Sequence, residues 1–296
     1  MSPHRATGDN ALMKEVSFSD RGLAVVTSSF LACLATILEL TPDALPRPAP
    51  GEDAATGWTF SRWLGGLGLG LASIAEPSSF SWPGPWIGRT GPSGAGERRC
   101  VVMYGVPSGV VWDPAGGPPV ERTSIEAGFL VAAADVALAL PPRPTSPAGS
   151  GTVESIWVAP RAGEPAQALE QVRALAGRGL DGDRHVTGSG TFPSGLPGSA
   201  LTLIEAEVCD SFDPPLSADE HRRNVTTRGI ELNRLVGHMF AIGAVRCRGM
   251  RLCEPCTVVQ RYASRPVLRE LVHRGGLRAD ILEGGEIKVG DEVRAL

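Results

Sequence analysis

Lysine is almost absent from this chain. Of its 28 basic residues only Lys14 and Lys288 are lysines, while glycine (37) and proline (25) are abundant. This bias is typical of a GC-rich coding sequence, so the clustering of arginines is informative and their number is not. The formal net charge of −4 provides no overall attraction to nucleic acid. We therefore expect no nucleic-acid partner.

The chain also has too few cysteines for a disulfide scaffold, and it has no long uninterrupted apolar run. Its six cysteines (33, 100, 209, 247, 253 and 256) are scattered except for the last pair, which favours a reducing compartment. The longest apolar run, residues 23–40, is interrupted by four hydroxyl residues and has the features of a buried helix. No basic region precedes it and no small-residue cleavage site follows it. We expect a cytoplasmic protein without a membrane-inserted segment.

Length and composition predict two domains. A chain of 296 residues with 42% hydrophobic and 20% charged residues is able to bury a sizeable core. The clearest linker composition, rich in proline, serine and glycine, lies around residue 145. We expect a flexible tail at 1–20, an α+β accessory domain at 21–142, a linker at 143–150 and a second domain at 151–296.

Hydrophobic patterns and turn residues predict the elements of each domain. In the first half we expect helices at 22–40 and 58–67, strands at 69–74, 100–106 and 109–112, a loop at 80–86, and helix or mixed structure at 124–140. In the second half we expect strands at 152–158, 200–204, 240–245 and 286–293, with helices near 205–211 and 266–274. Short strands with glycine turns favour a β-barrel. The predicted fold class is mixed α/β, mainly β: a C-terminal β-barrel with a few helices, preceded by a smaller α+β domain.

Cys256 carries the most chemically useful side chain of the chain, just after an expected strand. Its thiolate can act as a nucleophile, carry sulfur or ligate a soft metal, although a small buried residue is the commoner reason for a cysteine there. Cys253 lies three residues earlier. The pair resembles half of a zinc site, but no second pair stands at ligand spacing, so Cys253 is either a resolving thiol or structural.

Two basic, polar stretches are candidates for anion binding. In residues 178–185, three glycines expose backbone amides, and Arg178 and Arg184 supply forked donors suited to phosphate. The alternative is an ordinary turn with local ion pairs, in which His185 is a structural hydrogen bonder. Arg222 and Asn224 follow in residues 221–225, which also read as a solvated helix end. Asn224 offers a donor and an acceptor together.

The order of the motifs resembles the MOSC domain, which is named for the C-termini of molybdenum cofactor sulfurases. The resemblance extends over residues 151–296. It rests on seven stretches in the expected order: 151–156, 178–185, 201–205, 222–225 with 229–232, 235–237, Pro255-Cys256 and 284–291. Each stretch alone is weak, and their order makes the resemblance specific.

The resemblance implies a molybdenum cofactor, a molybdopterin whose dithiolene holds the metal. It makes Cys256 the molybdenum ligand and the catalytic residue. Arg184 and Arg222 become anchors of the cofactor and its phosphate, and Asn224 a contact of the pterin. Arg178 and His185 are further candidates near the pocket, and Arg251 is a weaker candidate for the same anion site.

The resemblance also implies an activity. Members of the family include bacterial proteins and the mitochondrial amidoxime-reducing component, which reduce N-hydroxylated compounds. We accordingly expect an oxidoreductase that reduces the N–O bond of a small-molecule substrate. The chain lacks the four clustered cysteines of a plant-type iron–sulfur domain, so no iron–sulfur cluster is expected and a separate electron-donor protein is.

Two other functions stay open. In the first, Cys256 carries a persulfide to a small molecule as a sulfurtransferase; the chain has no stretch long enough for a pyridoxal-phosphate desulfurase domain, so a separate sulfur donor is required. In the second, the protein is a non-catalytic carrier of the cofactor.

The sequence departs from the family pattern at two points. Glu254 stands where a small or basic residue is expected beside the metal. The first 150 residues do not resemble the N-terminal domain of the mitochondrial reductases. Their aromatic residues can either stack on a flat substrate or belong to a core: Trp82, Trp86, Tyr104 and Trp112.

Overall fold

The structure of the protein, a computed structural model, describes residues 15–17, 23–49, 53, 55, 57–92, 97–134, 149–190 and 197–296. The chain divides into two compact units, Met1–Pro48 with Glu76–Leu130 and Ala49–Ala75 with Val131–Leu296. Most of the expected tail (1–20) and of the expected linker (143–150) lies outside the described residues. The four-part division of the chain therefore stays a prediction.

The first unit packs one helix on an antiparallel sheet. It contains α1 (Val25–Leu38), η1 (Pro42–Ala44), β2 (Trp82–Thr90), β3 (Cys100–Gly105), β4 (Gly109–Trp112), η2 (Arg122–Ser124) and β5 (Ile125–Ala133), whose last three residues belong to the second unit. The strands follow the order β5-β2-β3-β4, and α1 packs on β2 and β3. Helix α1 ends at Glu39, which adopts φ 55°, shortly before Pro42. The predicted helix and the predicted β3–β4 hairpin are confirmed.

Two expectations for this unit are wrong. The expected loop at 80–86 is strand β2 from Trp82 onward, because its prolines fall where the register with β3 is interrupted and remove no ladder hydrogen bond. Trp86 is fully buried there, so it belongs to a core. The segment from residue 125 to 133 is strand β5, since pairing with β2 outweighs its weak helical pattern. Residues 135–140 lie outside the described part.

The second unit contains a closed barrel. Before it come α2 (Trp58–Gly66) and β1 (Leu69–Ile74). The strands that follow are β6 (Ser150–Val158), β7 (Gln167–Leu169), β8 (Gln171–Leu175), β9 (Gly179–Leu180), β10 (Leu201–Glu205), β11 (Val225–Arg228), β12 (Met239–Ile242), β13 (Val245–Leu252), β14 (Leu277–Glu283), β15 (Gly285–Lys288) and β16 (Glu292–Ala295). The helices are α3 (Ala206–Asp210), α4 (Ala218–His221), η4 (Leu232–Leu235), α5 (Thr257–Tyr262) and α6 (Leu268–Leu271).

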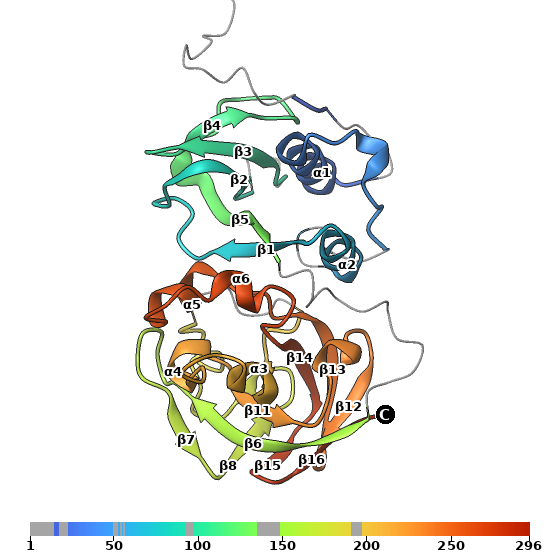
Figure 1. Ribbon diagram of the computed structural model, residues 1–296, viewed down its shortest axis with the longest axis vertical. Helices are drawn as coiled ribbons and strands as arrows, with labels where there is room; N and C mark the ends of the chain where they lie inside the picture. Colours follow the sequence, from blue (N-terminus) through green and yellow to red (C-terminus); the bar gives the residue numbers. More distant parts are fainter. Residues whose placement is uncertain are drawn as a thin grey trace, which may run out of the picture. The chain divides into compact units, whose positions relative to one another are not determined.

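Seven strands close the barrel in the order β11-β10-β14-β13-β12-β16-β6, with β11 pairing back to β6 (Figure 1). Strand β7 pairs antiparallel with β6, and β15, β8 and β9 form a separate three-stranded sheet. The predicted fold class, mainly β with a C-terminal barrel and a few helices, is confirmed. Two predicted strands are each divided by a turn: 240–245 contains the end of β12 and the start of β13, and 286–293 contains parts of β15 and β16.

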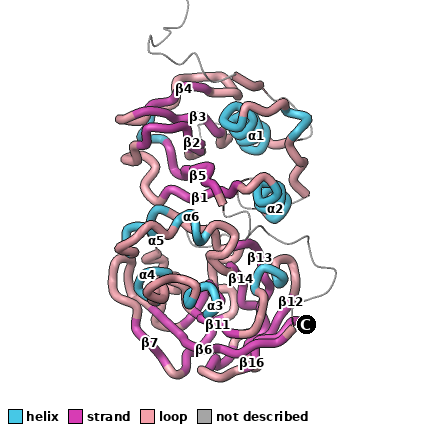
Figure 2. Tube along the Cα trace, in the orientation of Figure 1, coloured by secondary structure: helices cyan, strands magenta, loops and turns pink. Residues whose placement is uncertain are grey.

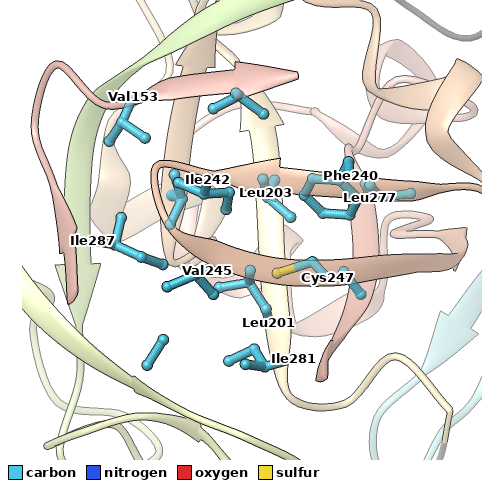
Figure 3. Close-up of a cluster of buried hydrophobic side chains, with 14 of the residues drawn as sticks. Val153, Leu201, Leu203, Phe240, Ile242, Val245, Cys247, Leu277, Ile281 and Ile287 are labelled. Atoms are coloured by element: carbon cyan, nitrogen blue, oxygen red, sulfur yellow. The ribbon is translucent and has the colours of Figure 1, made fainter. Parts of the chain in front are cut away.

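Every second side chain along the strands points into the barrel and fills its interior. Leu201 and Leu203 on β10, Leu277 on β14 and Phe240 on β12 are fully buried, and Figure 3 shows them among the clustered apolar side chains. The residues between them face the outside of the barrel. In β10 and β14 these are Thr202 and Arg278, which are Cα partners.

Short helices lie outside the barrel strands. Helix α5 contacts both α4 and α6, and Figure 2 shows the three close together. Helix α4 begins with a capping box in which Ser217 and Glu220 bond each other's backbone. Among the described residues, no helix has the length and apolar character needed to cross a membrane.

Candidate functional site

Residues 253–256, here the cysteine loop, join β13 to α5. Cys256 is the N-cap residue of α5 and has an extended backbone. Strand β13 ends at Leu252, so the loop begins where a strand of the barrel stops. Both cysteines are buried, with exposed fractions of 0% for Cys253 and 7% for Cys256.

Two segments of the same unit hold the cysteine loop by backbone contacts. The N–H of Ser73 donates to the Pro255 carbonyl at 3.2 Å, and the N–H of Ala75 donates to the hydroxyl of Thr257 at 3.0 Å. From the segment before β14, the Gly276 carbonyl accepts from the N–H of Cys253 at 2.7 Å. The loop is therefore fixed by residues 69–75 and by residues 273–276.

Two glycines allow residues 273–276 to approach the cysteine loop closely. A Cβ atom on Gly275 would lie 2.3 Å from the Cys253 carbonyl oxygen, and one on Gly276 would lie 1.9 Å from that of Leu203. Gly276 also has φ +99°, which favours glycine. The Gly-Gly pair thus lets the chain pass directly beside the cysteine loop before it enters β14.

Glu254 forms a buried pair with His273. Its two carboxylate oxygens lie 2.6 Å from Nδ1 and 2.8 Å from the backbone N–H of His273, and Nε2 lies 2.8 Å from the Leu69 carbonyl. Burial alone would lower the pKa of His273, but Glu254 and the Leu69 carbonyl outweigh burial and raise it. The carboxylate that departs from the family pattern is therefore paired with an imidazolium group.

Cys256 packs into an apolar cluster beneath α3, α5 and α6. Its neighbours in this cluster include Ile204, Val208, Val259 and Leu271. No metal-binding group of three or more histidine, cysteine, aspartate or glutamate residues occurs in the described part of the chain. These surroundings are those of a packed thiol with limited access to solvent.

Cys253 lies in a different electrostatic environment. Burial alone would raise the pKa of its thiol, yet the guanidinium groups of Arg223, Arg278 and Arg251 hold it below the ordinary value. By contrast, burial raises the pKa of Cys247, a core residue of the barrel, to about 12. The thiol of Cys253 is thus held below its ordinary pKa by three guanidinium groups.

Asp183 organises the region that contains most of the predicted cofactor residues. Its side chain is almost fully buried and accepts hydrogen bonds from the N–H groups of Ala159 and His185, each at 3.1 Å. It also accepts from Asn224 Nδ2 at 3.1 Å and lies 3.4 Å from Arg184. Groups from three parts of the chain, around residues 159, 184 and 224, are therefore held on one carboxylate.

The side chain of Asn224 is used within the protein. Its Nδ2 donates to Asp183 and to the Trp157 carbonyl, and its Oδ1 accepts from the Thr202 hydroxyl at 2.8 Å. Asn224 is 2% exposed. It therefore fixes Asp183 and Thr202 relative to each other.

Three arginines gather beside Asp183. Arg222 adopts φ 60° at the end of α4; its guanidinium lies over the Tyr262 ring at 4.7 Å and 3.5 Å from Asp219. Burial lowers the pKa of Arg184, and Arg222 and Arg223 lower it further while Asp183 and Tyr262 oppose them. These side chains are thus close enough to influence one another.

Arg223 has no carboxylate partner among the described residues. Its guanidinium donates to the carbonyls of Gly275 at 2.8 Å, His221 at 2.9 Å and Cys253 at 3.0 Å. The three carbonyl groups accept its hydrogen bonds but do not neutralise its positive charge. This charge lowers the pKa of the Cys253 thiol.

Arg251 lies on the outer face of β13 opposite Arg278 on β14. Burial first and then Arg278 lower the pKa of Arg251 to about 10. Burial, Arg184 and Arg278 lower the pKa of His185 to about 4, so His185 is neutral at physiological pH. Arg278 therefore interacts electrostatically both with Arg251 and with His185, which also interacts with Asp183.

The predicted residues fall into two groups and one outlier. Arg184, His185, Arg222 and Asn224 meet around Asp183, and Arg251 stands with Arg278. Arg178 is exposed in the turn between β8 and β9, and no side-chain hydrogen bond or ion pair joins it to the described residues of either group. Sequence reasoning missed Tyr262, Arg278 and the Glu254–His273 pair. Alternation in β14, with Leu277 and Ala279 inward, was a signal for Arg278.

The C-terminal part of the chain is thus a closed seven-stranded barrel with a cluster of arginines and a Cys-x-x-Cys loop. Residues 194–294, about a third of the chain, match the family described as MOSC domain. The predicted resemblance is confirmed, and the C-terminal part of the chain is a MOSC domain.

Several solved structures are similar to about half of the chain. The YuaD protein of Bacillus subtilis is similar at 17% identity and a TM-score of 0.42, covering 50% of this chain and 96% of its own. YiiM of Geobacillus stearothermophilus has 14% identity and a TM-score of 0.38, covering 49% of this chain and 75% of its own. YiiM of Escherichia coli has 14% identity and a TM-score of 0.37, covering 50% and 69%. No curated protein sequence matches the chain.

Proposed function

We propose that this protein binds the molybdenum cofactor in its MOSC domain and reduces the N–O bond of a small N-hydroxylated molecule, with electrons from a separate partner protein. The observation that carries the proposal is the excess of buried positive charge around Asp183. Arg184 and Arg222 are largely buried and Arg223 adds a third cation, whereas Asp183 is the only buried carboxylate there among the described residues. A buried cationic cluster of this kind is suited to an anionic ligand.

The residues present fit the anionic part of the cofactor. Arg184 and Arg222 are forked donors that would hold the terminal phosphate, and Tyr262 supports the Arg222 guanidinium from one face. Asp183 would keep Arg184 in place, and Asn224 would act through Asp183, since its own donors are already used. His185, neutral at physiological pH, would offer one ring N–H and one acceptor to the pterin.

Two cysteines form the thiol part of the site. Cys256 is the expected molybdenum ligand, and its sulfur would complete the coordination of a metal already held by two dithiolene sulfurs. When bound, the cofactor supplies the two-electron chemistry, while the chain binds, orients and tunes it. The apolar surroundings of Cys256 would exclude water from the metal side. Glu254, paired with His273, would contribute little uncompensated negative charge.

The acidity of Cys253 favours sulfur transfer as the second candidate. In that function Cys256 carries a persulfide received from a separate donor, and the substrate takes its outer sulfur. The Cys253 thiolate could then displace hydrosulfide from any persulfide that remains, forming a disulfide with Cys256. A thiol held below its ordinary pKa suits this resolving step.

The molybdenum-to-protein ratio tests the proposal. We expect about one molybdenum per chain, measured by elemental mass spectrometry after expression in a host that makes the cofactor. Cys256→Ser should lose the metal and Cys253→Ser should retain it. Arg184→Gln should lower the cofactor content, whereas the matched change Arg178→Gln, in an exposed turn, should leave it unchanged.

The outcomes separate the candidates. Loaded protein should reduce an amidoxime with a reduced dye as electron source, and loaded protein without turnover would be a carrier. Absence of molybdenum from wild type would contradict the proposal, and a persulfide on Cys256 in that protein would establish the second candidate.

A further inference from the structure

Two arginines lie side by side on the outer face of the barrel. Arg251 on β13 and Arg278 on β14 are Cα partners in an antiparallel pair. Their neighbours Leu252 and Leu277, also partners, are buried in the barrel core, so both arginines face outward. Directly opposed residues on one face of such a pair have Cβ atoms about 5 Å apart. The two guanidinium groups are thus held as neighbours by the backbone.

A bulge in β13 produces this arrangement. Val245, Cys247 and Gly249 face the core in strict alternation, which would turn residue 251 inward as well. The register shifts between Gly249 and Arg251, so Met250 is an extra residue and Arg251 moves to the outer face. The bulge therefore aims Arg251 at the position opposite Arg278.

Neither arginine has a carboxylate partner in the described part of the chain. Among the described residues, the Arg251 side chain donates from Nε to the Pro197 carbonyl at 3.3 Å, and no side-chain hydrogen bond or ion pair is formed by Arg278. Asp280 lies on the same face, but its Oδ1 accepts from the N–H of Gly198 at 2.7 Å and it forms no ion pair. Like charges directly opposite in a sheet are destabilising. The pair is therefore incomplete without a counter-charge.

The charge of the pair acts on two groups around it. Besides burial, Arg278 contributes to lowering the pKa of His185, and with Arg251 it lowers that of Cys253. Within the pair, burial and then Arg278 lower the pKa of Arg251, while Asp53 and Asp280 oppose them. These effects agree with two guanidinium groups placed as neighbours by the strand register.

The pair is separate from the cluster around Asp183. The groups that act on Arg184 are Asp183, Arg222, Tyr262 and Arg223, whereas those that act on Arg251 are Arg278, Cys253, Asp53 and Asp280. The two sets share no residue, although Arg184 and Arg278 both act on His185, and Arg223 acts on Cys253 together with the pair.

We propose that Arg251 and Arg278 form a second anion-binding site, which takes a small oxyanion such as the phosphate, sulfate or carboxylate group of a small molecule. Two adjacent forked donors match the oxygens of such a group in a bidentate manner. The site goes beyond cofactor binding, because it requires neither molybdenum nor the phosphate anchors Arg184 and Arg222. Its position beside Cys253 and His185 suits the charged group of a substrate.

Binding of inorganic phosphate and of acetate tests this site. The protein is made in a host without the cofactor, and Arg184→Gln with Arg222→Gln provides a background in which the first cluster cannot contribute. In this background, calorimetry should detect phosphate binding. Adding Arg278→Gln should weaken it at least about tenfold, because a charge-assisted pair of hydrogen bonds is lost. Arg248→Gln, on the exposed outer face of β13, is the matched control and should have no effect.

Thermal stability provides a second measurement that a merely structural arginine would not reproduce. Without added anion, Arg278→Gln should be at least as stable as wild type, because repulsion from Arg251 is relieved. With phosphate, wild type should become the more stable protein. Equal phosphate binding before and after Arg278→Gln, or a stability loss of the same size with and without phosphate, would overturn the proposal. Molybdenum content is measured separately, so the cofactor proposal can fail while this one holds.

Discussion

His221 and His273 are buried histidines in opposite protonation states. His221 is 3% exposed, and its Nδ1 accepts from the backbone N–H of Arg223 at 2.9 Å, which requires an unprotonated nitrogen. Burial, with Arg223 and Arg222 nearby, lowers the pKa of His221 to about 3. His273 is 2% exposed and has acceptors on both ring nitrogens, so it keeps both protons. The cysteine loop is thus flanked by one neutral and one charged histidine.

Acidification should destabilise the protein through His221. The unfolded chain takes up this proton below pH 6.5 and the folded chain only near pH 3, so stability is lost as pH falls through that window. At pH 5 this one group lowers the free energy of unfolding by about 2 kcal/mol. Urea unfolding at pH 7.5 and pH 5 should show a smaller loss for His221→Gln than for wild type. An equal loss would mean that His221 is protonated in the folded state.

Alkaline pH should act through His273 with the opposite sign. Its folded pKa is raised, so its stabilisation is complete below the unfolded pKa and disappears as pH rises through the folded value. The difference in unfolding free energy between wild type and His273→Gln should therefore be larger at pH 6 than at pH 9.5. The same difference at both pH values would contradict a charged His273–Glu254 pair.

At the scale of elements, a pair of glycines determines how the chain reaches β14. Gly276→Ala would place a Cβ atom 1.9 Å from the Leu203 carbonyl oxygen and would also strain a backbone with φ +99°. We expect a loss of more than about 3 kcal/mol in unfolding free energy, because the segment must move.

Gly177→Ala is the matched control for that substitution. Gly177 also has positive φ, +67°, but nothing lies within 4 Å of its Cβ position. Its loss should be only about 1 kcal/mol, from backbone strain alone. Urea unfolding of the two variants measures the difference, and similar losses would show that contact with Leu203 is unimportant.

Alternation predicted two strands of the barrel, β6 and β10, because each has one face in the core; it overlapped only parts of β12, β13 and β16 and missed β11 and β14. The strands at 152–158 and 200–204 are present nearly as expected. Where a strand bends, the pattern was insufficient. The bulge at Met250 cannot be read from alternation, so the pairing of Arg251 with Arg278 could not be predicted. Likewise, the prolines at the beginning of β2 suggested a loop. A proline is tolerated in a strand where no ladder hydrogen bond is needed, and the sequence alone does not show that the register with β3 is interrupted there.

At the scale of the whole molecule, the order of seven short motifs was enough to predict the MOSC domain and its barrel. It was not enough to predict the environment of Cys253. The acidity of Cys253 depends on Arg223 after α4, Arg251 on β13 and Arg278 on β14, which only the fold brings together. In the sequence Cys253 and Cys256 are only three residues apart. In the structure, arginines surround Cys253, whereas Cys256 packs in an apolar cluster.

Segment 69–75 precedes the barrel by some seventy-five residues, yet its backbone holds the cysteine loop and His273. This limits how the MOSC domain can be transplanted. A chimaera that takes the chain from residue 149 onward would inherit both cysteines and all the arginines discussed above, but not the Leu69 carbonyl or the N–H groups of Ser73 and Ala75. A transferable fragment should therefore begin near residue 49, where the second unit begins, and not at residue 194, where the family match begins. Recombination between residues 49 and 194 would separate the cysteine loop from segment 69–75, which holds it.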